Sequence, residues 1–196
     1  MINLQYFVLI GALVNILGAI SYIKKTLSGH TKPNRVTWFL WSVSPFIATA
    51  AALTKGITWA ALPVFMAGFG PFLIFLASFA NKKSYWKLGK FDYLCGFFSI
   101  LALTLWGITK EPIVAIVFAI LSDALAAIPT LKKSWTHPKT ESPIAYTTGM
   151  FNAITSFAAI KTWTFAEYGF PVYIIIICGL LLSFIYRLKI KNLFKR

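Results

Sequence analysis

Seven apolar stretches of about 20 residues follow one another along this chain and restrict its fold more than any other feature. A bilayer core of ~30 Å is crossed by about 20 residues of α-helix, so each stretch can span it. Only helices and closed barrels satisfy their backbone in lipid, and the stretches lack the alternation of barrel strands. The sequence therefore predicts an all-α polytopic membrane protein with seven transmembrane helices. The expected helices cover roughly residues 4–24, 35–54, 57–79, 91–109, 112–131, 143–160 and 168–187.

Positive charges lie between these stretches and are distributed unequally. Sixteen lysines and arginines fall in the first, third and fifth connections and the C-terminal tail, against Lys55, Lys110 and Lys161 on the other side. The positive-inside rule places the side with the sixteen basic residues in the cytoplasm. We therefore expect an outside N-terminus, an inside C-terminus and a basic tail at 188–196, in the cell membrane. The net charge of +14 follows from this topology and does not indicate a nucleic-acid partner.

The chain also contains an internal repeat. When residues 13–63 are aligned without a gap on residues 121–171, ten of 51 positions are identical. The identities include the scarce pair Lys24-Lys25, which matches Lys132-Lys133. Two repeats of three helices have the same orientation in the membrane only if one more helix lies between them. The repeat therefore predicts a 3+1+3 arrangement. The expected parts are a first bundle at 1–80, a linker helix at 81–110, a second bundle at 111–187 and the tail.

One segment of the second repeat carries a family resemblance. Residues 129–133, Pro-Thr-Leu-Lys-Lys, and the Ser142-Pro143 helix start after them resemble the PQ-loop signature, in which a Pro-Gln pair ends the helix before a basic loop. The 3+1+3 plan is similar to the PQ-loop and SWEET transporter superfamily, which includes vitamin carriers of the PnuC type. Thr130 stands where that family has glutamine, and the first repeat has Ser21-Tyr22 there. The resemblance implies a small-solute transporter that works by alternating access.

Four polar residues lie near the middle of their predicted helices. Asn15 and Asp123 match each other in the repeat, and so do Ser44 and Asn152. In transporters built from repeats the substrate site lies at this depth, between the repeats. We therefore expect these four residues to bind the substrate. For both asparagines the alternative is an interhelical hydrogen bond that only stabilises packing, worth ~0.6–2 kcal/mol.

Asp123 is the only acid placed deep within a predicted span. A carboxylate at the bilayer centre costs at least ~2.5 kcal/mol, and burial favours the protonated, neutral carboxyl group. No lysine or arginine within a span is available to neutralise it. A role in proton coupling or substrate binding is therefore expected. The alternative is a protonated side chain that hydrogen-bonds Ser122, Asn15 or a helix carbonyl.

Aromatic residues and prolines extend this prediction. Trp38, Trp41 and Tyr146 lie toward the cytoplasmic side of their helices, where they either anchor the protein in the membrane interface or line the pathway. Trp41 is deep enough to stack on a ligand ring, so Trp41 and Tyr146 join the candidate substrate site. Pro45 and Pro129 are the candidate hinges, because proline removes a helical hydrogen bond and allows a kink. They resemble the proline hinges of SWEET-like carriers.

The chemistry of the substrate is restricted by what the third and seventh helices lack. The SWEET sugar site typically uses asparagines on these two helices, and residues 57–79 and 168–187 contain none. A sugar is therefore not expected. A small solute with an aromatic, amide or cationic part fits Trp41, Asn15 and Asp123 better.

Other functions have less support. An intramembrane enzyme would need a second acid, a serine–lysine pair or a histidine cluster at one depth, and His30 and His137 lie in connections. The last helix has no lysine for a retinal Schiff base. Cys95 and Cys178 have no CxxC or histidine neighbours, so we expect ordinary buried residues, no metal site and no cofactor.

The remaining alternative is a ligand-binding membrane receptor or sensor on the same fold, which binds without transport. In either case the expected partners are a small-molecule substrate and the lipid bilayer. A homo-oligomer is a further alternative that the sequence leaves undecided.

Overall fold

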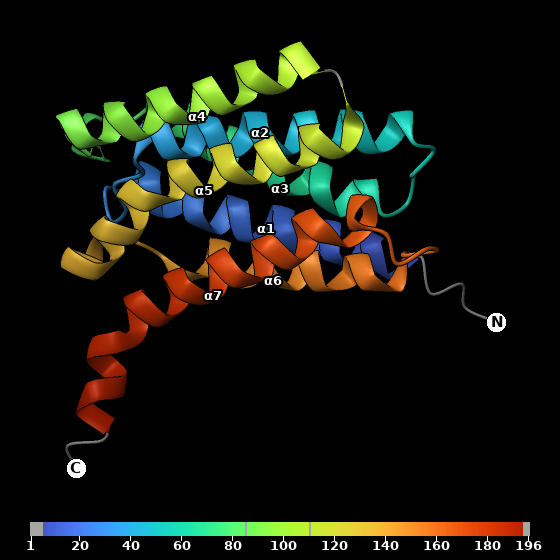
Figure 1. The fold of residues 1–196 in the computed structure, drawn as a ribbon. Helices are drawn as coiled ribbons and strands as arrows, with labels where there is room; N and C mark the ends of the chain where they lie inside the picture. Colours follow the sequence, from blue (N-terminus) through green and yellow to red (C-terminus); the bar gives the residue numbers. More distant parts are fainter. Residues whose placement is uncertain (1–5, 85, 110, 194–196) are drawn as a thin grey trace.

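The computed structural model describes residues 6–84, 86–109 and 111–193, and its regular secondary structure is entirely helical (Figure 1). The prediction of an all-helical chain with seven α-helices is confirmed for these residues. The connections contain short 3₁₀ turns at Lys82–Ser84, Pro138–Thr140 and Ser156–Ala158. The helices are α1 (Phe7–Leu27), α2 (Arg35–Thr54), α3 (Ala61–Ala77), α4 (Lys90–Thr109), α5 (Pro112–Thr136), α6 (Pro143–Thr155) and α7 (Phe165–Leu193).

Four segments of the described residues are long and apolar enough to cross a membrane. They are Phe7–Leu27, Arg35–Thr54, Ile113–Thr136 and Phe165–Arg187. The apolar helix α3 is shorter, at 17 residues, and α6 has 13 residues. These four segments support the membrane character that the apolar stretches of the sequence predicted.

Several helix boundaries differ from those expected. α3 begins at Ala61 instead of residue 57, because Gly56 adopts a left-handed φ of 73° and turns the chain. α6 ends at Thr155 instead of residue 160 and passes into a 3₁₀ turn. α5 continues to Thr136 and α7 to Leu193, so basic residues expected in connections extend helices instead. Residues 4 and 5 of the first expected helix, Lys110 and the end of the tail lie outside the described residues.

The starts of three helices follow from their local sequence. The Asn34 side-chain oxygen accepts a hydrogen bond from Thr37 N at 3.2 Å and caps α2. Pro112 and Pro143 occupy the first positions of α5 and α6, where the missing N–H costs no helical hydrogen bond. These starts fix where α2, α5 and α6 enter the bundle.

Six of the helices can be divided into two groups of three, α1–α3 and α5–α7, whose contacts correspond. In the first group α1 and α2 both lie against α3, and in the second group α5 and α6 both lie against α7. Between the groups, α1 contacts α6 and α2 contacts α5. The same pairings are recovered when α1, α2 and α3 are exchanged for α5, α6 and α7. Helix α4 packs on the outside, against α5 and α2 (Figure 1).

Three connections meet at one end of the helices, which we call the basic end. Lys32 N donates to the Thr140 carbonyl oxygen at 3.1 Å, and Asn81 Nδ2 donates to the Leu27 carbonyl oxygen at 2.6 Å. The C-terminal part of α7 leaves the bundle on this side, and the described chain begins on the other (Figure 1). The basic end consists of residues 28–34, 81–84, 86–89 and 137–142.

The two groups approach each other closely where α1 meets α6. A Cβ atom added at Gly18 would lie 1.9 Å from Thr148 Oγ1, and one added at Gly11 would lie 2.1 Å from Thr155 Oγ1. Any larger residue at either position would have to push the helices apart. Small residues at contacts between helices are typical of membrane bundles, where close backbone approach supplies the packing energy.

Candidate functional site

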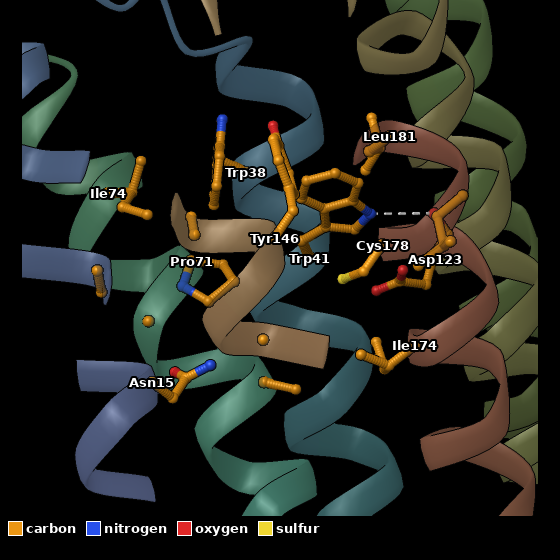
Figure 2. A pocket seen from close by; sticks show the side chains of 16 residues that line it. Asn15, Trp38, Trp41, Pro71, Ile74, Asp123, Tyr146, Ile174, Cys178 and Leu181 are labelled. Carbon is orange, nitrogen blue, oxygen red and sulfur yellow. Dashed lines mark hydrogen bonds between the residues drawn. The ribbon is translucent and has the colours of Figure 1, made fainter. Parts of the chain in front are cut away.

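A cavity lies inside the bundle, between the two helix groups (Figure 2). Its volume is about 70 Å³, and a single water molecule needs ~10–15 Å³. Most of its lining is apolar, with a few polar groups, which is the usual composition of a small-molecule site. All six helices of the two groups contribute to it, for example through Asn15 (α1), Trp41 (α2), Pro71 (α3), Asp123 (α5), Tyr146 (α6) and Cys178 (α7).

Asp123 provides the acidic group of this cavity and is only 2% exposed. Its Oδ2 atom accepts a hydrogen bond from the Tyr173 hydroxyl of α7 at 2.7 Å. Ser122 bonds Ser44 instead, and Asn15 lies on the opposite wall (Figure 2). The carboxyl group thus has a neutral phenol as its side-chain partner, and it can accept a proton or face a positively charged solute.

Sequence reasoning missed Tyr173. The available signal was a tyrosine among isoleucines inside a predicted span, because a buried phenol needs a hydrogen-bond partner. That signal does not identify the partner, since Tyr173 and Asp123 are 50 residues apart.

Asn15 provides an amide group on the other wall of the cavity (Figure 2). It lies between two glycines of neighbouring helices: a Cβ atom at Gly70 of α3 would be 3.0 Å from Asn15 Oδ1, and one at Gly149 of α6 would be 3.8 Å from Asn15 Nδ2. These glycines leave space around the amide. Because an amide both donates and accepts hydrogen bonds, Asn15 can bind a hydrogen-bond donor or a hydrogen-bond acceptor of a solute.

Three aromatic residues form one wall of the cavity. Trp38, Trp41 and Tyr146 are buried and line it, so they do not belong to a lipid-facing belt. The rings of Trp38 and Trp41 meet edge to face with centroids 5.3 Å apart, and Trp38 stacks on Tyr146 at 6.2 Å. Trp41 Nε1 donates to the Asp123 backbone oxygen at 3.2 Å, which fixes this indole beside the acidic group (Figure 2). The wall offers flat apolar surfaces to a ligand ring.

Ser44 and Asn152 are not among the residues that line the cavity. Ser44 Oγ donates to Ser122 Oγ at 3.2 Å and connects α2 to α5. Asn152 Nδ2 donates to the Pro63 carbonyl oxygen at 2.7 Å and connects α6 to α3. The structure therefore brings four of the six expected site residues together, and it places these two in contacts between helices.

The two candidate hinge prolines lie inside helices that face each other. Pro45 is buried within α2 and Pro129 within α5. Neither proline can donate the helical hydrogen bond of its turn. Near Pro129, the Ala126 carbonyl oxygen accepts a hydrogen bond from Thr37 Oγ1 of α2 at 2.8 Å. The bend-prone part of α5 is thus tied to α2.

A buried charged cluster that the sequence did not reveal lies next to the aromatic wall, at the basic end. Lys133 near the end of α5 pairs with Glu141 in the α5–α6 connection, and both side chains are fully buried. Glu141 Oε2 accepts hydrogen bonds from the hydroxyls of Tyr22 and Tyr146, each at 2.8 Å. We call these four residues the basic-end cluster.

The repeated lysine pair was the available signal for this cluster. The second lysine of each pair reaches a connection of the other helix group: Lys25 Nζ donates to Ser142 Oγ at 3.0 Å, and Lys133 Nζ donates to the Lys32 carbonyl oxygen at 2.5 Å. The sequence connected both lysines with the internal repeat and the membrane topology, and it did not indicate these contacts. The two lysines match in the predicted repeat, and each makes a contact of the same kind with the other group.

The four long apolar helical segments place this chain in the class of helical membrane proteins. Within the described residues, no group of three or more His, Cys, Asp or Glu side chains could hold a metal ion. Comparison with protein-family models, with curated proteins and with solved structures finds no match to this chain.

Proposed function

We propose that this protein is a small-solute membrane transporter of the PQ-loop and SWEET type, which moves its substrate by alternating access. The observation that carries the proposal is the cavity between two equivalent helix groups, with an amide on one wall and a carboxyl group on another. A site at the boundary of two repeats can be exposed to either side when one repeat rocks against the other.

The proposal includes a 3+1+3 architecture, with α1–α3 and α5–α7 as parallel repeats and α4 as the linker helix. The equivalent helix pairings support it, and so do the crossed contacts of Lys25 and Lys133. The chain then has an outside N-terminus and an inside C-terminus in the cell membrane, because the basic end meets the cytoplasm.

The proposed substrate is a small solute with an aromatic, amide or cationic part. Asn15, Trp41, Asp123 and Tyr146 are the proposed binding residues, since all four line the cavity. Asp123 is in addition the proposed proton-coupling residue. Ser44 and Asn152 hold the helices around the cavity together: Ser44 joins α2 to α5, and Asn152 joins α6 to α3.

Substrate identification comes first in testing this function. A thermal-shift screen of the purified protein against a metabolite library, at two pH values, selects ligands that stabilise it. Selected ligands are then tested for flux in proteoliposomes. Saturable flux supports a transporter, and binding of the same ligand without flux supports the receptor alternative.

Cys178 gives an independent test of the site. Its thiol lines the cavity, whereas the buried Cys95 of α4 is not among the lining residues. We expect the transported ligand to slow alkylation of Cys178 in a Cys95→Ser protein and to leave Cys95 unaffected in a Cys178→Ser protein. Equal protection of both cysteines would indicate general stabilisation and would contradict this site.

A further inference from the structure

The basic-end cluster joins the two helix groups through one carboxylate. Tyr22 belongs to α1, whereas Lys133, Glu141 and Tyr146 belong to α5, α6 and the connection between them. Glu141 accepts from both tyrosines, which lie on opposite sides of the boundary between the groups. Lys133 reaches the first group as well, through the Lys32 carbonyl oxygen. The cluster is therefore a bridge between the groups.

The same cluster lies directly beyond the cavity. The Tyr146 ring lines the cavity while its hydroxyl is bound to Glu141, and Figure 2 shows that hydroxyl directed away from Asn15. Tyr22 packs on Trp38, another lining residue, with ring centroids 4.9 Å apart. These rings lie between the cavity and the Glu141 carboxylate, which accepts hydrogen bonds from the hydroxyls of both tyrosines.

A buried ion pair is suited to a contact that opens and closes. Burying two charges costs hydration, so a buried pair adds little net stability over apolar residues. When the groups separate and water enters, both charges regain their hydration, which offsets the lost attraction. Apolar packing has no such compensation on opening, because exposing apolar surface to water is unfavourable. The chemistry of the cluster thus favours reversible closure.

We infer that Glu141 and Lys133, with Tyr22 and Tyr146, form a latch that closes the cavity at the basic end. This inference rests on the proposed alternating access of the same site. Release of the latch separates Tyr22 from Tyr146 and opens the aromatic wall toward the basic end. With the latch closed, that exit is blocked.

Access to Cys178 measures the state of the latch. A charged, membrane-impermeant methanethiosulfonate is applied to each face of sealed vesicles that contain the Cys95→Ser protein. A separate Lys139→Cys protein, with both native cysteines replaced by serine, identifies the basic face, since Lys139 is exposed there. Cys178 is buried, with 7% of its surface exposed, so we expect its reaction from the basic face to report opening on that side.

Glu141→Gln leaves Lys133 buried without its counter-charge. We expect Cys178 to react at least about tenfold faster from the basic face, because removing one member of a buried pair destabilises the closed arrangement by more than the ~1.4 kcal/mol that a tenfold shift requires. Tyr22→Phe keeps the ion pair and removes one hydrogen bond across the boundary. It should raise the rate several-fold and serves as the test if Glu141→Gln does not fold.

Glu167→Gln is the matched control, because Glu167 is a buried carboxylate away from the cluster. It accepts hydrogen bonds from the backbone N–H groups of Lys161 and Thr162 at 2.9 and 3.1 Å. This variant should leave the rate from the basic face unchanged. Folded Glu141→Gln and Tyr22→Phe proteins that react at the parent rate, or equally faster from both faces, would overturn the latch.

The labelling needs no substrate, so its result is separate from that of the flux measurement. Side-selective labelling without flux keeps the latch as the entrance of a ligand-binding receptor and removes the transport function. Flux without any effect of Glu141→Gln on labelling keeps transport and removes the latch.

Discussion

Asp123 and Asn15 differ in what they can do although they occupy equivalent positions of the predicted repeat. Asn15 keeps one hydrogen-bonding state, with a donor and an acceptor, over the whole physiological pH range. Asp123 can gain or lose a proton, and Tyr173 is its side-chain partner. An exact repeat would have two equal walls. Of these two residues, only Asp123 can therefore carry a proton.

Asp123→Asn tests whether Asp123 couples transport to protons. Asparagine keeps the shape and an oxygen that can accept from Tyr173, but it removes the titrating proton. We expect the variant to fold and to exchange substrate across the membrane, and to lose uptake driven by a pH gradient. A gradient of one pH unit supplies ~1.36 kcal/mol per proton, or about tenfold accumulation, and the variant should show none.

Tyr173→Phe is the companion of that variant, because it removes the hydrogen bond and leaves the carboxyl group able to titrate. Gradient-driven uptake should persist, with stability lowered by ~0.5–1.5 kcal/mol. Unchanged pH-driven uptake in Asp123→Asn would rule out proton coupling. Loss of exchange as well would assign Asp123 to direct substrate binding.

Among the elements, the contact between α1 and α6 decides how the two groups fit together. Gly11 and Gly18 lie on α1, and each faces a threonine of α6. Threonine is branched at Cβ, so it cannot move its methyl and hydroxyl groups far without changing rotamer. The separation of α1 and α6 is thus set by residues without room for a methyl group.

Gly18→Ala should therefore weaken this contact. An added Cβ would lie 1.9 Å from Thr148 Oγ1, and overpacking of this kind costs typically ~1–3 kcal/mol. Thermal unfolding of the purified protein measures the loss as a lower melting temperature. Gly179→Ala in α7 is the control, because a Cβ there meets nothing within 4 Å and alanine favours the helix by ~1 kcal/mol. Equal melting temperatures for the two variants would refute the close contact.

The molecule as a whole has one end rich in basic residues, and this determines how it is expected to lie in the membrane. Lys32, Lys87 and Lys139 belong to the three connections of that end, while Lys55 and Lys161 belong to connections on the other side. Helices inserted with these charges in the cytoplasm need not carry them across the bilayer.

Cysteine labelling of intact cells tests this orientation. In a protein with Cys95 and Cys178 replaced by serine, Lys87→Cys and Lys139→Cys should react with an impermeant maleimide only after the membrane is opened. Lys161→Cys should react from outside, since all three positions are exposed at the protein surface. Labelling of Lys87→Cys in sealed cells would reverse the proposed topology.

The sequence by itself determined the helices, their apolar character and the separation of the basic connections. These features are local: a helix is specified by a run of neighbouring residues, and proline, glycine and asparagine mark its ends. The sequence also indicated Asn15 and Asp123 as candidates, because polar groups at mid-helix depth are costly in lipid unless they have a use. It indicated Trp41 and Tyr146 because their rings can stack on a ligand.

Only the tertiary structure decided which of these residues share one cavity. Ser44 and Asn152 have the same predicted depth as Asn15 and Asp123, but depth does not fix the direction in which a side chain points. In the basic-end cluster, Tyr22 binds Glu141, which lies 119 positions away in the sequence. From its place in a basic connection, Glu141 would be predicted to be an exposed acid. Its burial depends on how closely α1 approaches α6, and that distance is set by the packing of side chains from distant parts of the chain.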